Sequence, residues 1–270
     1  MSDQQLRDAL DLVAPLVVSA GRWIRARADE HETGGRLQVS SKADPSDFVT
    51  EVDVEVERRL FSLLTMHFPS YGFLSEEGTS LTPDAEYVWV LDPVDGTRNF
   101  INAHAGYCVS LGLLHRGDAV LGIVYDIVSD ELYTAIRGGG AYCNGRRLSV
   151  SAATAPGLCT VGVGFTPGAR TEAAQVDRYM RLLHGTAALR QSGSVARDLA
   201  YVARGSLDAF WQPEVSPWDV AAGMLLVEEA GGNVRLLHEG ADWVTAQRLG
   251  VFAVNAAAGD GLGAVLFPGP

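Results

Sequence analysis

The first apolar residues of the chain recur every three or four positions, which is the spacing of one face of an amphipathic helix. They are Leu6, Leu10, Val13, Val17, Ala20 and Ile24. Ser2, with Gln5 three residues later, forms a capping-box pattern at the start of this predicted helix. The polar, turn-rich residues 30–48 then predict a mobile loop, and Thr50 begins a second predicted helix that ends near Pro69. The inner face of that helix carries Val56, Leu60, Leu63 and Leu64.

From about Gly72 to Val150 the hydrophobic period changes to that of β-strands. Short apolar or alternating runs are separated by turn sequences: "YVWVL", "CVSLGLLH", "AVLGIVYDI" and "ELYTAI". This pattern predicts an antiparallel meander. The glycine-rich stretch "RGGGAYCNG" is interpreted as a hairpin turn within it.

After about residue 150, strands and helices alternate. Strands are expected at "CTVGVGF", "ALRQSG", "LDAFW", "NVRLL" and "VFAVN", and helices over 172–183, 194–205 and 217–230. Such alternation favours a sheet covered by helices. We place a domain boundary near Val150 to Pro156, which separates an N-terminal α+β domain (residues 1–150) from a C-terminal α/β domain (residues 151–270).

The composition is that of a globular protein: 47% of the 270 residues are hydrophobic, and the net charge is −12. Such an acidic charge argues against binding to nucleic acid or to an anionic membrane. Three widely spaced cysteines without a CxxC pair are expected to be buried thiols in a reducing compartment. The chain has no signal-peptide pattern and no apolar run long enough to span a bilayer, so we expect a cytoplasmic protein.

Carboxylates stand at the ends of four apolar segments. They are Asp53 in "VTEVD", Glu76 and Glu77 in "GFLSEEG", Asp92 and Asp95 in "WVLDPVDGTRNF", and Asp219 in "SPWDVAAG". Asp53 and Asp219 each follow a Thr or Ser by three residues, so both also fit a helix-capping box that needs no metal. The two glutamates also fit a solvated turn. If they continue a strand, their side chains point to opposite faces, and we choose Glu76 as the one that faces a site.

Asp92 and Asp95 are harder to explain without a ligand. Two close carboxylates repel each other unless one is protonated or a cation lies between them. Pro93 fixes the turn between them, Val94 leaves a carbonyl free, and Gly96 lets the backbone approach a ligand. Mg²⁺ prefers carboxylates, carbonyls and water, and two metals that share a carboxylate recur in phosphoryl transfer. These residues therefore predict divalent cations, which would supply the positive charge that an acidic protein needs to bind an anionic substrate.

At these positions the sequence resembles the inositol monophosphatase family. The matching patterns are "DFVTEVD", "GFLSEEG", "WVLDPVDGTRNF" and "PWDVAAGMLLVEEAGG", which occur in the family order and span nearly the whole chain. The resemblance implies a layered α-β-α-β-α fold of the inositol monophosphatase and fructose-1,6-bisphosphatase type. It also implies Mg²⁺-dependent hydrolysis of a phosphate monoester, a homodimer and sensitivity to lithium.

The resemblance also implies the metal ligands. One Mg²⁺ would be held by Glu76, Asp92 and the carbonyl of Val94. A second would be held by Asp92, Asp95 and Asp219. A third, looser ion would use Glu76 and water.

The catalytic and phosphate-binding residues follow from the same resemblance. Thr97, with Glu76 and Asp53, would orient the attacking water, which a bound metal makes acidic. Asp95, Gly96 and Thr97 are expected beside the phosphate, with the backbone N–H groups of Gly96 and Thr97 donating to its oxygens. Lys42 is expected either to approach the phosphate or the attacking water, or to be a solvated surface side chain.

The stretch "SGSVARDLAYVARGSLDAFWQ" matches the family segment that contacts the polyol. Gly193, Ser194 and Val195 fill its first part, and Gln212 stands where many inositol phosphatases have a glutamate. An amide accepts a hydrogen bond from a hydroxyl but lacks the charge that strengthens it. Glu214 is a nearby acid that could take this role, and Gln212 alternatively caps a strand end. The preferred alcohol is therefore left open.

The leading interpretation is a Mg²⁺-dependent phosphatase that acts on inositol 1-phosphate or on a related sugar or polyol phosphate. Histidinol phosphate, fructose 1,6-bisphosphate and 3′-phosphoadenosine 5′-phosphate remain alternative substrates on the same scaffold. An alternative from a different class is a regulatory binding protein, the role ascribed to some bacterial relatives with the transcription machinery.

Overall fold

A computed structural model describes residues 1–41, 48–82, 84–165, 172–238, 242–245 and 249–268. The helices are α1 (Asp3–Glu32), α2 (Glu51–His67), α3 (Thr97–Ile101), α4 (Ala173–Gly185), α5 (Val195–Ala203), α6 (Pro217–Glu229) and α7 (Gly259–Leu266), with a 3-10 turn at Pro156–Leu158. The first large sheet contains β3 (Gly72–Ser75), β4 (Ser80–Leu81), β5 (Tyr87–Asp95), β6 (Cys108–His115), β7 (Asp118–Asp126), β8 (Glu131–Ile136), β9 (Gly140–Cys143) and β10 (Arg146–Arg147). The second contains β11 (Thr160–Val163), β12 (Ala188–Arg190), β13 (Ala209–Gln212), β14 (Gly232–His238) and β15 (Leu249–Asn255), and β1 (Val39–Ser41) pairs with β2 (Phe48–Thr50).

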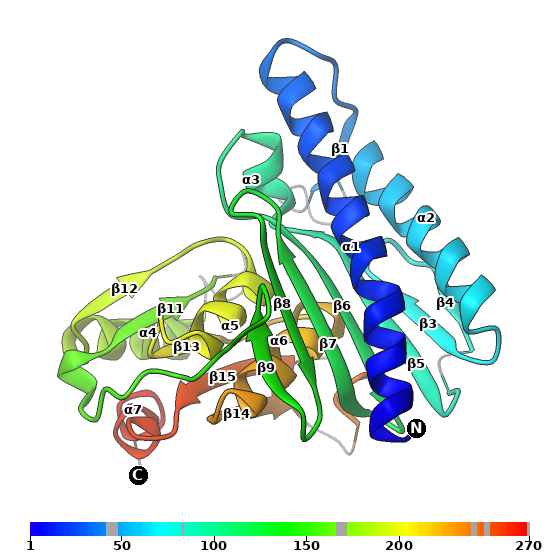
Figure 1. Cartoon of the computed structure of the whole chain (residues 1–270). Coiled ribbons are helices and arrows are strands. Elements are labelled where there is room, and N and C mark those ends of the chain that lie inside the picture. The colour runs from blue at the N-terminus through cyan, green and yellow to red at the C-terminus, as the bar shows by residue number, and fades with distance from the viewer. Residues whose placement is uncertain (42–47, 83, 166–171, 239–241, 246–248, 269–270) are drawn as a thin grey trace.

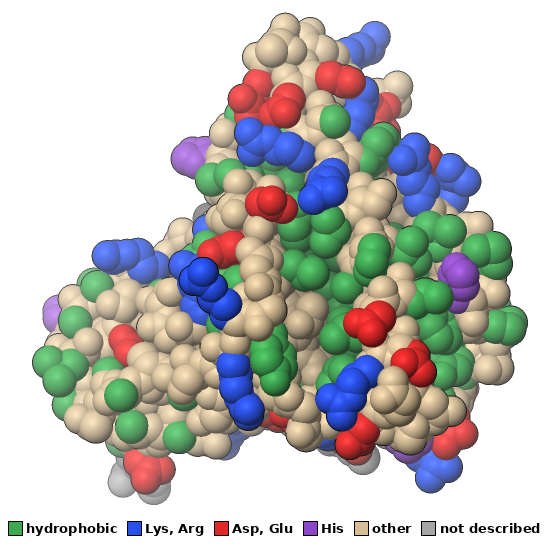
Figure 2. Space-filling view, in the orientation of Figure 1, with side chains coloured by type: hydrophobic (Ala, Val, Ile, Leu, Met, Phe, Trp, Pro, Cys, Tyr) green, Lys and Arg blue, Asp and Glu red, His purple; other side chains and the backbone are tan. Residues whose placement is uncertain are grey.

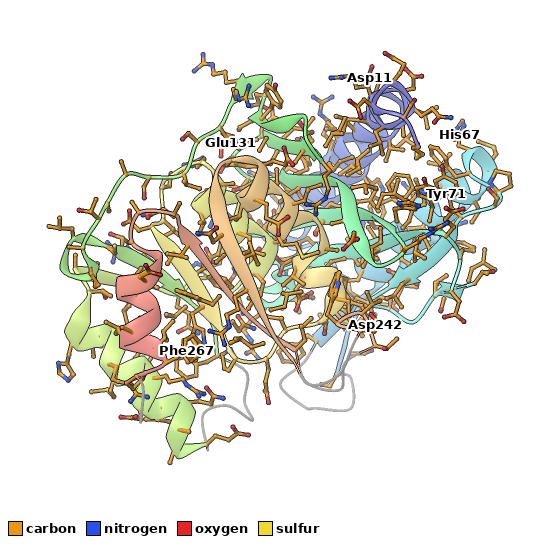
Figure 3. The ribbon with its side chains drawn as sticks, turned by 90° about the horizontal axis from the view of Figure 1, so that it is seen from below. Asp11, His67, Tyr71, Glu131, Asp242 and Phe267 are labelled. Carbon is orange, nitrogen blue, oxygen red and sulfur yellow. The ribbon has the colours of Figure 1, made fainter. Side chains whose placement is uncertain are left out.

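The two sheets and their helices form the five layers of an α-β-α-β-α sandwich (Figure 1). Helices α1 and α2 cover one face of the eight-stranded sheet, and α5 and α6 lie between the two sheets. Helices α4 and α7 cover the outer face of the five-stranded sheet. Figure 3 shows the same layers from below, with α1 and α2 at one side and α4 and α7 at the other. The predicted layered fold is confirmed.

Alternate residues of β5 enter different layers, as the period of a strand requires. Trp89 and Leu91 pack under α1 and α2, whereas Val88 and Val90 face α5 and α6. Both faces of the strand are therefore apolar, which explains why "YVWVL" is an unbroken hydrophobic run rather than an alternating one.

The two N-terminal helices begin where their capping residues predict. The Ser2 side chain accepts a hydrogen bond from the backbone N–H of Gln5, and Thr50 caps α2. The expected loop over residues 30–48 is only partly correct, because α1 continues to Glu32 and residues 39–41 pair with residues 48–50. Lys42 lies outside the described residues.

The first sheet departs from the predicted antiparallel meander at its edge. Strands β3 and β5 pair in parallel, with Ser75 opposite Leu91, and the short strand β4 completes the connection. In addition, "RGGGAYCNG" contains two turns, at residues 137–139 and 144–145, because Gly140–Cys143 between them is the strand β9. The parallel pair matters for function, because it places the ends of β3 and β5 at the same edge of the sheet.

A β-bulge in β5 brings two aspartates to one face of the sheet. Asp92 pairs with Ser110 and Asp95 with Cys108, so three steps along β5 match two steps along β6. Side chains three positions apart in a regular strand would point to opposite faces, and the extra residue removes this difference. Pro93 suits the bulge because it has no N–H to contribute to the ladder. The predicted proline-led turn after the strand is thus a bulge within it.

Helix α6 lies directly on the backbone of the central strands. A Cβ atom at Gly112 would come within 2.9 Å of the Ala221 side chain, and one at Gly122 within 2.7 Å of the Ala222 carbonyl oxygen. Glycine in the sheet and alanine in the helix therefore allow a close approach. This contact sets the distance between α6 and the sheet, and with it the position of the first turn of α6.

The proposed boundary near residue 150 coincides with the division between the two sheets, since β10 ends at Arg147 and β11 begins at Thr160. The two parts nevertheless share one core, in which α5 and α6 pack against β5, β7 and β8 as well as against β15. The division into two domains stays a prediction. The sequence interpretation did not include α7, whose Leu262 and Leu266 are buried against the second sheet.

Charges of both signs are mixed on the surface shown in Figure 2, where Lys and Arg side chains are interspersed with Asp and Glu. None of the helices in the described part of the chain is both long enough and apolar enough to cross a membrane.

Candidate active site

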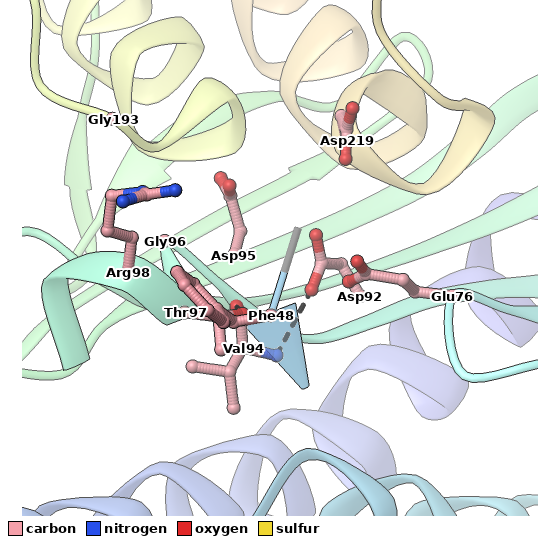
Figure 4. A pocket seen from close by; sticks show the side chains of 10 residues that line it. All are labelled: Phe48, Glu76, Asp92, Val94, Asp95, Gly96, Thr97, Arg98, Gly193 and Asp219. Atoms are coloured by element: carbon pink, nitrogen blue, oxygen red, sulfur yellow. Dashed lines mark hydrogen bonds between the residues drawn. The ribbon is translucent and has the colours of Figure 1, made fainter. Parts of the chain in front are cut away.

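A pocket of about 170 Å³ opens at the end of β5, beside α3 and the first turns of α5 and α6 (Figure 4). It is lined by Phe48, Glu76, Asp92, Val94, Asp95, Gly96, Thr97, Arg98, Gly193 and Asp219. All five predicted metal-binding residues are among them. Four carboxylates from distant parts of the sequence therefore share one small space.

Asp92 is held by its own local turn. One of its carboxylate oxygens, Oδ1, accepts a hydrogen bond of 3.1 Å from the backbone N–H of Val94. The Glu76 N–H donates to the Leu91 carbonyl at 3.2 Å, so the parallel pairing of β3 and β5 brings Glu76 next to Asp92. Burial raises the pKa of Asp92 well above its ordinary value, and the nearby charge of Glu76 raises it further.

Glu57 on α2 supports the turn that carries Glu76, and the sequence interpretation missed it. Its two carboxylate oxygens accept hydrogen bonds from the backbone N–H groups of Glu77 (3.0 Å) and Thr79 (3.1 Å). Glu57 is itself buried. The available signal was an acid on the inner face of a helix, beside the apolar positions Val56 and Leu60, because a buried charge needs partners.

Asp95 is held by the first turn of α5. Its carboxylate accepts hydrogen bonds from the Ser194 hydroxyl (2.7 Å), the Val195 N–H (3.3 Å) and the Ala196 N–H (2.6 Å). Burial raises the pKa of Asp95 to about 6, although the bonds from Ser194 and Ala196 act to lower it. The thiol of Cys108 lies 3.7 Å from Asp95 Oδ2. The contribution of Ala196 was not predicted.

Asp219 stands in the first turn of α6, where it also acts as the predicted cap. Its Oδ2 accepts a 2.7 Å hydrogen bond from the Ser216 N–H. The Ser110 hydroxyl donates to the Trp218 carbonyl at 3.3 Å, and Ser110 is the sheet partner of Asp92. The capping and pocket-lining interpretations of Asp219 are therefore compatible, because a carboxylate has an oxygen for each.

Asp53 contacts the pocket through Thr97. Its Oδ2 accepts hydrogen bonds from the N–H (2.9 Å) and the hydroxyl of Thr50. Its Oδ1 lies 3.2 Å from the Thr97 hydroxyl, which also lies 3.0 Å from the Val94 carbonyl. Burial raises the pKa of Asp53 to about 6, whereas the bonds from Thr50 act to lower it. Asp53 is not among the pocket-lining residues, and the hydrogen bond from Thr97 and the nearby charge of Glu76 couple it to them.

Gly96 adopts a conformation that other residues avoid. Its φ angle is +94°, and a Cβ atom would lie 2.8 Å from the Gly106 carbonyl oxygen. Its own carbonyl accepts hydrogen bonds from the N–H groups of Asn99 and Phe100, which begins α3 immediately after β5. The sharp change of direction leaves Gly96 and Thr97 on the pocket wall.

The predicted substrate segment is only partly at the pocket. Gly193 lines it, while Ser194 and Val195 are turned to Asp95. Gln212 does not line the pocket, and its side-chain amide donates a 2.7 Å hydrogen bond to the Glu214 carbonyl. This contact agrees with the alternative in which Gln212 closes a strand end.

Asn99 fixes the loop that carries Gly193, and it was not predicted. Its side-chain Nδ2 donates to the carbonyls of Gly106 (2.7 Å) and Ser192 (2.8 Å). The loop after β12 is thereby tied to α3. The "NF" that follows "DGTR" was the only sequence signal for this contact.

The donor set matches a hard cation in its chemistry. Among the described residues, no three His, Cys, Asp or Glu side chains already form a cluster that could hold a metal ion. The pocket nevertheless offers four carboxylates and one backbone carbonyl, which are the oxygen ligands that Mg²⁺ prefers. The buried acids have raised pKa values, which is the expected result when no cation compensates them. Side-chain rotations would therefore have to accompany metal binding.

Comparisons with known proteins agree on one family. The model of the inositol monophosphatase family matches residues 9–264. The chain is 38% identical over 226 residues to an inositol-1-monophosphatase of Rhizobium meliloti, which covers 83% of each chain. It is 40% identical over 208 residues to a protein of Pseudomonas aeruginosa named Nus factor SuhB, covering 74% of this chain and 76% of that one. The crystal structure of the extragenic suppressor protein suhB from Bartonella henselae superposes with a TM-score of 0.88 at 33% identity, over 97% of this chain and 100% of that one.

Proposed function

The chain belongs to the inositol monophosphatase family and is a phosphoric monoester hydrolase, and we propose that it uses Mg²⁺ to hydrolyse a small sugar or polyol phosphate such as inositol 1-phosphate. One observation carries the proposal: Glu76, Asp92, Asp95 and Asp219 line a single pocket although the sequence separates them widely. Inositol-1-monophosphatase is the name of a relative that is 38% identical.

The proposed metal ligands fall into two overlapping sets. Glu76, Asp92 and the carbonyl of Val94 would hold one Mg²⁺, and Asp92, Asp95 and Asp219 would hold a second. A third ion would use Glu76 and water. Bound in the pocket, Mg²⁺ supplies positive charge for the phosphate and makes water acidic enough to attack at neutral pH.

Thr97 is the residue that we assign to orienting the attacking water. Its hydroxyl proton is directed to Asp53 or to the Val94 carbonyl. The lone pairs of Thr97 Oγ1 are then available to accept a hydrogen bond from a water molecule in the pocket. Asp53, with a pKa raised to about 6 by burial, can accept a proton close to neutral pH. Glu76 faces the same space and would orient the water from the opposite side.

The start of α3 is assigned to the phosphate. The backbone N–H groups of Gly96 and Thr97 belong to the first turn, where N–H groups have no partner within the helix. Two such donors on the pocket wall, next to the acids that would hold metal, suit the oxygens of a phosphoryl group.

The experiment is a phosphate-release assay with and without Mg²⁺. Its substrates are inositol 1-phosphate, glycerol 2-phosphate, histidinol phosphate, fructose 1,6-bisphosphate and 3′-phosphoadenosine 5′-phosphate. We expect Mg²⁺-dependent turnover of at least one sugar or polyol phosphate, and the ranking assigns the substrate. If all five stay intact in Mg²⁺, the proposed activity is wrong.

A regulatory role is the second proposal, because one relative that is 40% identical bears the name Nus factor SuhB. Co-purification of a transcription protein, together with inert substrates, would favour it. The homodimer, the lithium sensitivity and the cytoplasmic location expected from the sequence stay predictions, as does the absence of nucleic-acid and membrane binding. Size-exclusion chromatography and lithium inhibition of the assay would test the first two.

A further inference from the structure

Arg98 brings a positive charge into a pocket that is otherwise acidic. It is the one Lys or Arg among the described residues that line the pocket, and it stands directly after Thr97 at the start of α3. The proposed phosphatase mechanism assigns no role to Arg98. A guanidinium in a pocket that has to receive an anion is a candidate for substrate recognition.

Both the backbone and the guanidinium of Arg98 are held by contacts with neighbouring residues. The Arg98 carbonyl accepts hydrogen bonds from the Asn102 backbone N–H (3.2 Å) and side-chain amide (2.8 Å), which hold the backbone. The guanidinium carbon lies 4.9 Å from the centre of the Phe48 ring, within the range of a cation–π contact. Arg98 is exposed to solvent. Its charge therefore lies at the rim of the pocket rather than at its base.

Arg98 and the metal-binding acids lie on different sides of the pocket. In Figure 4 the guanidinium extends below Gly193 towards Asp95, whereas Glu76, Asp92 and Asp219 lie across from it. The phosphate to be cleaved belongs with those acids and their metal. The rest of the substrate would then lie on the side of Gly193, which is the side of Arg98.

The segment that resembles the polyol-contacting segment of the family differs from it in one charge. Position 212 is a glutamine, where the family resemblance predicts a glutamate, and its amide is turned to the Glu214 carbonyl. Compared with that pattern, the chain lacks one negative charge at position 212. This difference and the positive charge of Arg98 both favour a substrate with negative charge away from the scissile phosphate.

We propose that Arg98 selects monoesters whose alcohol part carries a second anionic group, either a carboxylate or another phosphate. A guanidinium can bind either group through two parallel hydrogen bonds. This assignment rests on the proposed phosphatase function, because it takes the position of the cleaved phosphate from that function. It makes Arg98 a specificity-determining residue of the alcohol side.

Two substrate pairs test the assignment. Glycerol 3-phosphate and 3-phosphoglycerate differ by a hydroxymethyl and a carboxylate, and fructose 1-phosphate and fructose 1,6-bisphosphate differ by one phosphate. For each pair the ratio of kcat/KM, charged over neutral, is measured in the wild type, Arg98→Gln and Arg98→Lys. Calorimetry with the same compounds gives the binding preference without turnover. The two pairs separate recognition of a carboxylate from recognition of a phosphate.

The control variant is Arg116→Gln, which removes the same charge at the opposite end of β5. Arg116 lies in the turn after β6, beside the start of β5, and pairs with the exposed Glu86 at 3.0 Å. We expect Arg98→Gln to lower the charged-over-neutral ratio about fivefold or more in at least one pair, as for loss of a charged hydrogen bond at a partly exposed site. Arg98→Lys should keep part of the preference, and Arg116→Gln should keep all of it.

The outcomes separate the two proposals. An unchanged ratio in Arg98→Gln, or an equal fall in Arg116→Gln, would overturn the role of Arg98 whether or not hydrolysis occurs. If no compound is hydrolysed but calorimetry shows a preference that depends on Arg98, the phosphatase function fails and the recognition of a second anion stands.

Discussion

Asp95 and Asp126 occupy equivalent places in the sheet but have different surroundings. Asp95 at the end of β5 and Asp126 at the end of β7 both pair with Cys108, one on each side of it. Both are buried, and both are contacted by the first turns of α5. Asp126 accepts a 2.7 Å hydrogen bond from Arg197 Nε and a 3.1 Å hydrogen bond from the Tyr201 hydroxyl.

The difference between the two aspartates lies in the charge of their partners. Asp126 has a cation from its own chain, whereas a hydroxyl, a thiol and backbone N–H groups contact Asp95. Dipoles orient a carboxylate but do not neutralise it, and Asp95 also lies in a pocket with three other acids. Removing one partner of a buried ion pair is costly, so Asp126 is expected to matter for stability. Asp95 has no such cation among these partners, which fits its proposed role as a metal ligand.

Replacing Asp95 by asparagine gives the largest expected effect. We expect kcat to fall at least roughly a hundredfold, as for removal of a principal transition-state stabiliser. The fold should persist, because an asparagine oxygen can still accept from α5 and the cost of a buried charge is removed. Turnover and thermal melting without metal are measured on the same sample. Normal turnover by Asp95→Asn would show that the metal assignment is wrong.

Asp126→Asn should lower the stability of the fold and leave turnover nearly unchanged, which is the reverse of the result expected for Asp95→Asn. Removing this charge leaves the largely buried Arg197 without its ionic partner, which we expect to lower the free energy of unfolding by about 3 kcal/mol. Urea denaturation measures the change. The kcat of the remaining folded protein should stay close to that of the wild type. A loss of turnover at full stability would remove the distinction between the two aspartates.

The free energy of unfolding of the metal-free protein should fall as the pH rises from about 4 to 7. Burial raises the pKa of Asp53 and of Asp95 to about 6, and that of Asp198 to about 7. The native state then keeps protons that the unfolded chain releases near pH 4, so its stability decreases up to the folded pKa values. At about 1.4 kcal/mol per pKa unit, we expect a loss of several kcal/mol, measured by urea denaturation in a metal chelator.

Mg²⁺ should reduce this pH dependence, since a bound cation favours the ionised form of Asp95. Asp198 is not a proposed ligand, and its contribution should remain. A metal-free protein that is most stable at pH 7.5, and that Mg²⁺ does not stabilise further, would contradict the idea of a pocket with uncompensated acids.

Ser194→Ala tests how far the dipoles around Asp95 contribute, and it gives the smallest expected effect. The variant removes one 2.7 Å hydrogen bond and leaves the two backbone donors in place. We expect kcat/KM to fall about fivefold, which corresponds to about 1 kcal/mol for one hydrogen bond. A Mg²⁺ titration of activity should show weaker binding as well. An unchanged rate and Mg²⁺ affinity would mean that the backbone alone positions Asp95.

The helices and their caps were predictable because the decisive interactions are local. The capping boxes at Ser2 and Thr50 require residues only three positions apart, and Asp219 was correctly placed in the first turn of its helix. The sequence patterns also named every carboxylate that lines the pocket. Their roles as ligands stay proposals.

The pairing of strands was less predictable, because it depends on contacts that the sequence pattern does not encode. An antiparallel hairpin would have placed Glu76 beside the start of β5, far from Asp92, and the parallel pairing of β3 with β5 brings them together. The role of Ala196 was also hidden, because its contact with Asp95 uses only a backbone N–H. Backbone donors leave no trace in side-chain patterns.

The extra residue in β5 has a consequence for how this chain can vary. Asp92 and Asp95 share a face only because the strand is one residue out of phase with β6 between them. Deleting Val94 would restore an ideal ladder with Asp95 still opposite Cys108, but it would remove the carbonyl that is proposed as a metal ligand. A redesign that keeps the length of the strand and removes the bulge would instead turn Asp92 and Asp95 to opposite faces of the sheet, and so eliminate the pocket while improving the hydrogen bonding of the sheet.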